Sequence, residues 1–185
     1  INSVSKNKSS IKTYYSYLNN VIELFAKYPP TEIYYFAAVH YSSQEKELEK
    51  DENSMLFTNY FLPLHISNLC INSKERVKII FASSSLVFAG LESSPQSELS
   101  ERIPLCEYSK QKIMTENVLN KLSLNSNLDA YIAILYNHES IARKVKFFTR
   151  KVISFCIRYK DNLSPSHKLI LFNPDNEIDL SLIHI

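Results

Sequence analysis

Four short apolar runs divide the chain and predict buried β-strands. Each run lacks the alternation of polar and apolar residues that marks a half-exposed strand, so each is expected to be covered on both faces. The runs are EIYYFAA at 32–38, VKIIFASSSLVF at 77–88, AYIAILY at 130–136 and KLILF at 168–172. The second run contains three consecutive serines, which brings hydroxyl groups to the end of a buried strand.

Segments with apolar residues at helical spacing separate these runs and predict helices. The expected helices span 11–28, 55–69, 107–122 and 144–159, and loops or solvated segments are expected at 1–10, 44–52, 93–104 and 123–127. Pro29 and Pro30 should end the first helix, because proline cannot continue one. Pro63 should bend the second helix for the same reason.

The alternation of helices and buried strands predicts an α/β fold. It indicates a parallel sheet whose strands are joined by right-handed helical crossovers, with helices on both faces. In a sheet of this kind the functional groups lie just beyond the carboxyl ends of the strands. These positions are 38–43, 83–85, 137–140 and the residues from Asn173 onward.

Composition and charge exclude several functions. The 185 residues are 45% hydrophobic and 22% charged, as in a soluble globular protein. A net charge of +2 supplies no strong field for nucleic acid or an anionic membrane, so neither is an expected partner. There is neither an apolar run long enough to cross a bilayer nor a visible secretory leader, which favours a cytoplasmic location.

Glycine, cysteine and histidine exclude further kinds of site. Gly90 is the one glycine, whereas a P-loop or a GxGxxG turn needs several residues without a side chain close to the phosphate. The three cysteines and five histidines show no metal-ligand spacing. We therefore expect no phosphate-binding glycine turn in these residues, no disulfide framework and no metal site.

One constellation suggests catalysis. Ser84 ends a predicted strand, and Tyr108 and Lys112 lie four residues apart on a predicted helix, so they share one helical face. The ammonium should lower the pKa of the phenol toward the working range. A phenolate beside a serine hydroxyl could remove a proton from a bound alcohol while a hydride leaves to a nicotinamide. Tyr and Lys at this spacing alone usually mark a solvated helix face; the order of serines, helix and buried strand favours a site.

This order of motifs resembles the extended short-chain dehydrogenase/reductase family, and within it the GDP-mannose 4,6-dehydratases, over about residues 17–180. The landmarks are EIYYFAA at 32–38, FASSSLVF at 81–88, EYSKQK at 107–112, LYNHES at 135–140 and FFTRKV at 147–152. The last two are the most specific, since epimerases that share only the Tyr–Lys spacing lack them. The resemblance implies a Rossmann-like doubly wound parallel sheet that lacks its first βα units. Residues 1–140 would form an incomplete NAD(P)-binding domain, and 141–185 part of a substrate-binding region interleaved with a late strand.

The resemblance also implies roles for matching positions. Catalysis is implied for Ser84, Tyr108 and Lys112. Cofactor contacts are implied for Phe36, Ala37, Ala38, Val39, His40, Lys112, His138 and Arg143, and substrate contacts for Asn137 and Lys151. The implied cofactor is NADP, with NAD as the alternative, and the implied substrate is GDP-mannose or a related nucleotide-sugar. His138 could instead cap a strand end, Lys151 could be a solvated base, and a homo-oligomer is expected because the family's members commonly associate.

Several positions depart from the family pattern. Leu86 stands two residues after Ser84, where the dehydratases use a carboxylate to remove the C5 proton of the sugar. Ile141-Ala142 replace a Pro-Arg pair, and Ile178 replaces an arginine expected near the diphosphate. Three hypotheses follow: a lyase that converts GDP-mannose to GDP-4-keto-6-deoxymannose through oxidation at C4, a related nucleotide-sugar reductase or epimerase, and an inactive fragment.

Overall fold

The computed structural model of the chain describes residues 2–40, 51–92, 95–138, 140, 142 and 148–160. The chain divides into two compact units, residues 1–135 and 136–185. The described helix of the second unit is α5 (Phe148–Lys160), which confirms most of the helix expected at 144–159. The strand expected at 168–172 lies outside the described residues.

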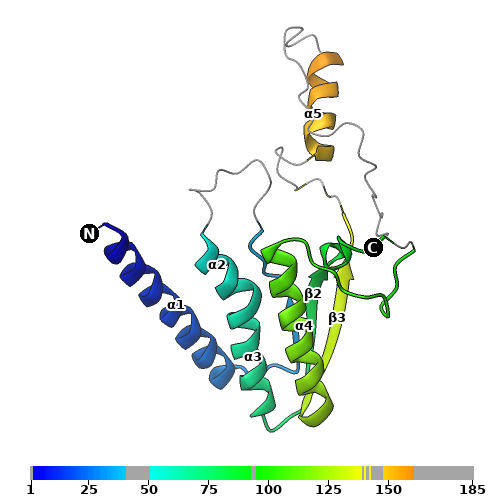
Figure 1. Cartoon of the computed structure of the whole chain (residues 1–185). Coiled ribbons are helices and arrows are strands. Elements are labelled where there is room, and N and C mark those ends of the chain that lie inside the picture. The colour runs from blue at the N-terminus through cyan, green and yellow to red at the C-terminus, as the bar shows by residue number, and fades with distance from the viewer. Residues whose placement is uncertain are drawn as a thin grey trace. The chain divides into compact units, whose positions relative to one another are not determined.

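The first unit contains a three-stranded parallel sheet in the order β1-β2-β3 (Figure 1). The strands are β1 (Glu32–Tyr35), β2 (Val77–Ser84) and β3 (Leu128–Leu135). β1 and β2 lie within expected apolar runs, whereas β3 begins two residues before the run expected at 130–136. Phe81 of β2 is paired with Tyr35 on one side and Ile132 on the other. The parallel sheet joined by helical crossovers confirms the expected Rossmann-like α/β class.

Three helices cover one face of this sheet (Figure 1). They are α1 (Asn2–Lys27), α3 (Leu62–Ile71) and α4 (Glu107–Asn125), and α3 packs against both of the others. The core lies between these helices and alternate residues of the strands, among them Val77, Ile79 and Phe81 of β2. Complete burial of each of these three side chains stabilises the sheet by roughly 2 kcal/mol relative to exposure.

The second face of the sheet departs from expectation. Tyr34 is 60% exposed and Tyr131 is 55% exposed, although their runs were expected to be buried on both faces. Among the described residues of the first unit, no helix covers this face (Figure 1). Tyrosine suits this position because its ring packs on the sheet while its hydroxyl stays polar, and the Tyr34 hydroxyl donates to Glu32 at 3.0 Å.

Element boundaries also differ from those expected. α1 begins at Asn2 rather than at 11, since the Ser, Asn and Lys residues before 11 carry only small helix-propensity costs. The second run leaves the sheet at Ser84, and residues 85–88 form a short 3₁₀ helix, η3 (Ser85–Phe88). Ser84 ends the strand because its side chain accepts a hydrogen bond from the Leu86 amide at 3.3 Å.

The expected bend near Pro63 takes the form of a π-helical turn. α2 (Glu52–Leu56) continues into η2 (Phe57–Phe61), where the Leu62 amide donates to the Phe57 carbonyl five residues back, and then into α3. Pro63 has no amide hydrogen, so it cannot donate to a carbonyl of the preceding turn. Two hydroxyls donate there instead: Tyr35 to the Thr58 carbonyl at 2.5 Å, and Thr115 to the Asn59 carbonyl at 2.7 Å.

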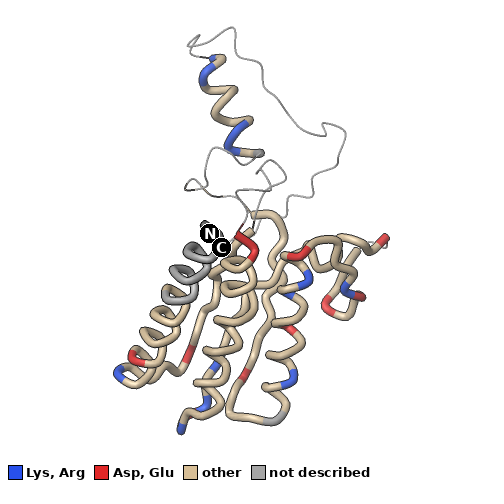
Figure 2. Tube along the Cα trace, turned by 60° about the vertical axis from the view of Figure 1, so that its left-hand side comes forward, with Lys and Arg blue, Asp and Glu red and all other residues tan. Residues whose placement is uncertain are grey.

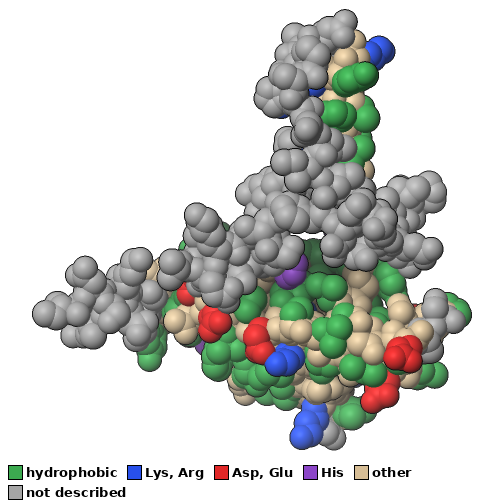
Figure 3. All heavy atoms as spheres, turned by 45° about the horizontal axis from the view of Figure 1, so that its top comes forward, with side chains coloured by type: hydrophobic (Ala, Val, Ile, Leu, Met, Phe, Trp, Pro, Cys, Tyr) green, Lys and Arg blue, Asp and Glu red, His purple; other side chains and the backbone are tan. Residues whose placement is uncertain are grey.

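Basic and acidic residues are interspersed along the trace (Figure 2). On the face shown in Figure 3, single charged side chains are scattered among hydrophobic ones in the described residues. Arg76 pairs with Asp129 and Lys78 with Glu32, and in each pair at least one side chain is exposed. Across the described residues, no helix combines the length and apolarity of a membrane span.

Gly90 permits a close approach of two backbone segments. Its amide donates to the Ile103 carbonyl at 2.9 Å, and a Cβ placed on it would lie 3.1 Å from that oxygen and 3.1 Å from the Ile103 Cβ. We expect Gly90→Ala to lower the free energy of unfolding by about 1–3 kcal/mol, because the two segments must move apart. Urea unfolding measures this, with the exposed neighbour in Ala89→Ser as the control; equal stability of the two variants would contradict the packing argument.

Candidate functional site

The candidate site lies at the carboxyl end of β2, beside the first turns of α4. Ser84 is the last residue of the strand, and Tyr108 and Lys112 lie on α4. The Ser84 side chain lies close enough to the Tyr108 phenol to lower its pKa, so the two hydroxyls expected to share the site are near one another. The structure thus brings Ser84, Tyr108 and Lys112 together.

The start of α4 fixes the direction of these side chains. Cys106 is the N-cap residue, and its amide hydrogen-bonds the side chain of the buried Ser109 at 3.3 Å. A reciprocal cap of this kind fixes the first helical turn. From that turn, Tyr108 and Lys112 project on the same side, one helical turn apart.

Lys112 is buried against the strand. It is 1% exposed, its ammonium donates to the Ala82 carbonyl at 2.8 Å, and it lies 4.6 Å from the centre of the Phe81 ring. Burial lowers the pKa of Lys112 to about 8, because removing a cation from water disfavours its charged form. The carbonyl and the aromatic face partly compensate for the lost water.

The expected downward shift of the Tyr108 pKa is wrong for the structure described. Burial raises the pKa of Tyr108 above its ordinary value, and the nearby Ser84 side chain only partly opposes this rise. The Lys112 ammonium lies 5.6 Å from the centre of the Tyr108 ring and is not among the causes of the shift. Sequence spacing places the cation on the correct helical face, but it does not reveal that desolvation outweighs its charge.

The segment after β1 reaches the same site. The His40 ring contacts the Tyr108 ring edge-on, with 4.6 Å between ring centres. Phe36, Ala37 and Ala38 are exposed beside the strand end, and Val39 is half-buried. Four of the five residues expected to pass under a cofactor are therefore exposed, and one of them, His40, contacts Tyr108.

Asn59 holds this segment in place and was missed by sequence analysis. Its fully buried side chain accepts from the Val39 amide at 3.0 Å and donates to the Val39 carbonyl at 2.9 Å. Its second amide hydrogen donates to Gln111 of α4 at 3.1 Å. The sequence signal that could have identified it is an amide side chain within the apolar stretch before Pro63. A polar group buried in such a stretch requires hydrogen-bond partners.

The position at which the resemblance implies a carboxylate is aliphatic. Leu86 lies in η3, two residues after Ser84, and is exposed. Its side chain can neither accept nor donate a proton. The geometry at this end of β2 supports proton transfer at Tyr108 and Ser84, but residue 86 adds no second base.

The remaining expected site residues belong to the second unit, and one of them lies outside the described residues. In that unit Asn137 and His138 are exposed, and the His138 Nδ1 atom lies 2.9 Å from the Tyr136 carbonyl oxygen. This contact fits the alternative reading of His138 as a cap at the strand end. Lys151 lies on α5 and is half-buried, and Arg143 falls outside the described residues.

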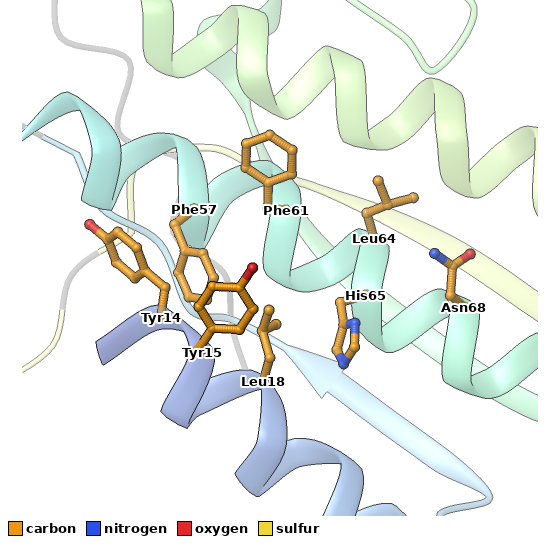
Figure 4. Close-up of a pocket in the computed structure, with 8 residues that line it drawn as sticks. All are labelled: Tyr14, Tyr15, Leu18, Phe57, Phe61, Leu64, His65 and Asn68. Carbon is orange, nitrogen blue, oxygen red and sulfur yellow. The ribbon is translucent and has the colours of Figure 1, made fainter. Parts of the chain in front are cut away.

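A cavity of about 540 Å³ lies apart from these side chains, between α1 and the η2–α3 helix (Figure 4). It is lined by Tyr14, Tyr15, Leu18, Phe57, Phe61, Leu64, His65 and Asn68. Tyr14 and Phe57 stack there with 4.4 Å between ring centres. None of Ser84, Tyr108 and Lys112 lines this cavity, so it is distinct from the candidate site.

Comparison with known protein sequences agrees with these motifs. The sequence model of the family described as GDP-mannose 4,6 dehydratase matches residues 4–183. GDP-mannose 4,6 dehydratase 2 of Caenorhabditis elegans is 29% identical over 135 residues. The match covers 71% of this chain and 34% of that protein, so the chain spans about a third of the length of this relative.

Solved structures share the fold at low identity. RMD from Pseudomonas aeruginosa, complexed with NADPH, superposes with a TM-score of 0.67 at 18% identity, over 80% of this chain and 50% of that one. UDP-glucuronic acid 4-epimerase from Bacillus cereus, in complex with UDP-glucuronic acid and NAD, gives 0.61 at 19% identity, over 75% and 42%. With its strand-end serine, Tyr–Lys helix and parallel sheet, and with the family model matching nearly its whole length, the chain belongs to the GDP-mannose 4,6 dehydratase family.

Proposed function

We propose that the chain carries the proton-transfer part of an enzyme that oxidises a nucleotide-sugar at C4 with a nicotinamide dinucleotide, as the first step of converting GDP-mannose to GDP-4-keto-6-deoxymannose. The observation that carries this proposal is the adjacency of the Ser84 hydroxyl, the Tyr108 phenol and the Lys112 ammonium at the end of β2. A hydroxyl pair beside a buried cation suits removal of a proton from an alcohol.

The residues present suit the nicotinamide end of such a cofactor. Lys112 offers a buried cation, and residues 36–38 offer exposed, mostly small side chains between β1 and His40, which contacts Tyr108. The cofactor, when bound, supplies the acceptor for the sugar hydride. Gly90, the one glycine of these 185 residues, packs against Ile103 and is not part of a phosphate-binding turn. We favour NADP, because the resemblance to GDP-mannose 4,6-dehydratases implies it and because RMD from Pseudomonas aeruginosa is complexed with NADPH.

Each residue of the cluster has a distinct role in this proposal. Tyr108 takes the proton of the sugar 4-hydroxyl, and Ser84 orients that hydroxyl through its own hydrogen bond. Lys112 holds the ribose of the cofactor through its ammonium group. His40 packs against Tyr108 and limits the movement of its ring.

Further roles are proposed for four residues after Leu135, on the ground of their match to the family motif alone. His138 and Arg143 would contact the cofactor, while Asn137 and Lys151 would contact the nucleotide-sugar. A homo-oligomer and a cytoplasmic location also stay predictions.

Leu86 favours a second candidate, a nucleotide-sugar reductase or epimerase. Oxidation and reduction at C4 need only the hydroxyl pair and the cofactor, whereas loss of water from C5 and C6 needs a further proton acceptor. Because Leu86 cannot act as that acceptor, the elimination step is the part of the dehydratase reaction that this chain is least equipped to perform.

Titration calorimetry and product analysis of the 185-residue chain test the proposal. We expect NADP to bind with a dissociation constant below about 1 mM, and Lys112→Met to bind at least about tenfold more weakly. Mass spectrometry after incubation with GDP-mannose and NADP then separates the two candidates: loss of one water indicates a dehydratase, and an isobaric product indicates an epimerase. No binding of NADP or NAD by the folded chain would show that it is an inactive fragment.

A further inference from the structure

A buried carboxylate lies beside the proposed site and has no part in the proton transfer described above. Glu116 is 3% exposed and lies on α4, one helical turn beyond Lys112. It accepts a hydrogen bond from the Ser83 hydroxyl, and its other oxygen lies 3.4 Å from the Arg102 Nε atom. Ser83 directly precedes Ser84, so this carboxylate contacts the strand end that carries the proposed catalytic hydroxyl.

Arg102 is itself held in a fixed orientation. One of its terminal nitrogens donates to the Glu98 carbonyl at 2.6 Å and to the Ser100 carbonyl at 2.8 Å. The guanidinium also lies 5.2 Å from the centre of the Phe88 ring. Because these contacts fix its position, Arg102 contributes a constant positive charge on one side of Glu116.

Few other charges reach this part of α4. The elements that pack most closely against α4 are β2, β3, α3, η2 and η3. Of these, α3, η2 and η3 contain no Asp, Glu, Lys or Arg, and their titratable residues Tyr60, His65 and Cys70 make no hydrogen bond to Glu116. Lys78 and Asp129 of the strands form ion pairs on the opposite face of the sheet. Among the described residues, the charged groups that lie near Glu116 are therefore Lys112 and Arg102.

We propose that Glu116 is a positioning residue of this site, whose carboxylate keeps the Lys112 ammonium in its charged form and ties Ser83, and with it Ser84, to α4. The proposal rests on the proposed function and deepens it, because a charged Lys112 matters where the ribose of a cofactor binds. Burial lowers the pKa of Lys112 to about 8, and the negative charge of Glu116 opposes this fall. Without that charge, Lys112 would lose its proton at a lower pH.

Titration of Lys112 in the folded chain tests this role. The protein is labelled with ¹³C at lysine Cε, the Lys112 signal is assigned with Lys112→Met, and its shift is followed against pH. We expect Glu116→Gln to move the Lys112 midpoint down by about one pH unit. Glu107→Gln is the matched control, since Glu107 is an exposed acid on the same helix that pairs with Lys110, and it should leave the midpoint unchanged. An unchanged midpoint in folded Glu116→Gln would overturn the proposal.

Two further measurements keep the outcome decisive. If Glu116→Gln does not fold, Glu116→Asp retains the charge and should hold the midpoint near its normal value, whereas a fall of a full unit would contradict the role of the carboxylate. NADP affinity measured against pH should also fall at a lower pH in Glu116→Gln than in the unaltered chain, by the same amount as the Lys112 midpoint. If the unaltered chain binds no dinucleotide, the proposed function fails, and the Lys112 titration still decides the role of Glu116.

Discussion

Replacement of Tyr108 by phenylalanine should lower turnover of the nucleotide-sugar by about a thousandfold, because the phenol oxygen is the proposed proton acceptor. The ring, its packing against His40 and the helix cap all remain in Tyr108→Phe, so the fold should be retained. Steady-state kinetics of product formation measures the loss, and calorimetry with NADP should show binding within about threefold of the unaltered chain.

The pH dependence supplies a check on the same residue. Proton removal needs the phenolate, so the rate should rise with pH until Tyr108 is ionised. Since burial raises the pKa of Tyr108, this rise should extend above neutral pH, and it should be absent in Tyr108→Phe. Tyr131→Phe on the exposed sheet face is the matched control and should keep full activity. Turnover by Tyr108→Phe within fivefold of normal would exclude Tyr108 as the proton acceptor.

Removal of the Asn59 side chain should lower the free energy of unfolding by about 2–4 kcal/mol. Asn59→Ala leaves the Val39 amide, the Val39 carbonyl and the Gln111 side chain without the partner they have in the structure, and each orphaned group costs about 1–3 kcal/mol if water cannot reach it. Val39 is only half-buried, so water can partly replace the lost hydrogen bonds and the total loss stays below the sum of three full penalties. Urea unfolding followed by circular dichroism measures the loss.

Hydrogen exchange separates local from general destabilisation in this variant. The Val39 amide should exchange much faster in Asn59→Ala than in the unaltered chain, while core amides of β2 should change only as the global stability does. Asn68→Ala removes an exposed amide side chain from the following helix and should change neither quantity. Unchanged exchange at Val39 would mean that Asn59 does not anchor the segment.

The parallel sheet could be predicted because short apolar runs that alternate with helical segments indicate parallel strands. Val77, Ile79 and Phe81 alternate with residues on the second face, and their burial under α3 and α4 determines where the strand lies. The grouping of Ser84 with Tyr108 and Lys112 also follows from sequence, since strand ends and helix starts meet at one edge of such a sheet. These features depend on local pattern and on topology alone.

Other features depend on which groups lose water, and sequence does not reveal that. The exposure of Tyr34 and Tyr131 reflects what covers the second face of the sheet, and the upward pKa shift of Tyr108 reflects how deeply its ring is buried. In the sequence, Glu116 is indistinguishable from the other charged residues of a solvated helix. In the structure it is buried and accepts a hydrogen bond from Ser83, beside the candidate site.

The π-helical turn at η2 has a consequence for sequence alignment. Such a turn accommodates one residue more than an α-helical turn over the same advance, so residues 57–61 contain a single insertion relative to a regular helix. A relative that lacks this extra residue would continue as an ordinary helix, and an ungapped alignment would then set the wrong side chain opposite Val39. The counterpart of Asn59 in other chains should therefore be found by superposing the helices after Pro63, with a one-residue gap placed before it.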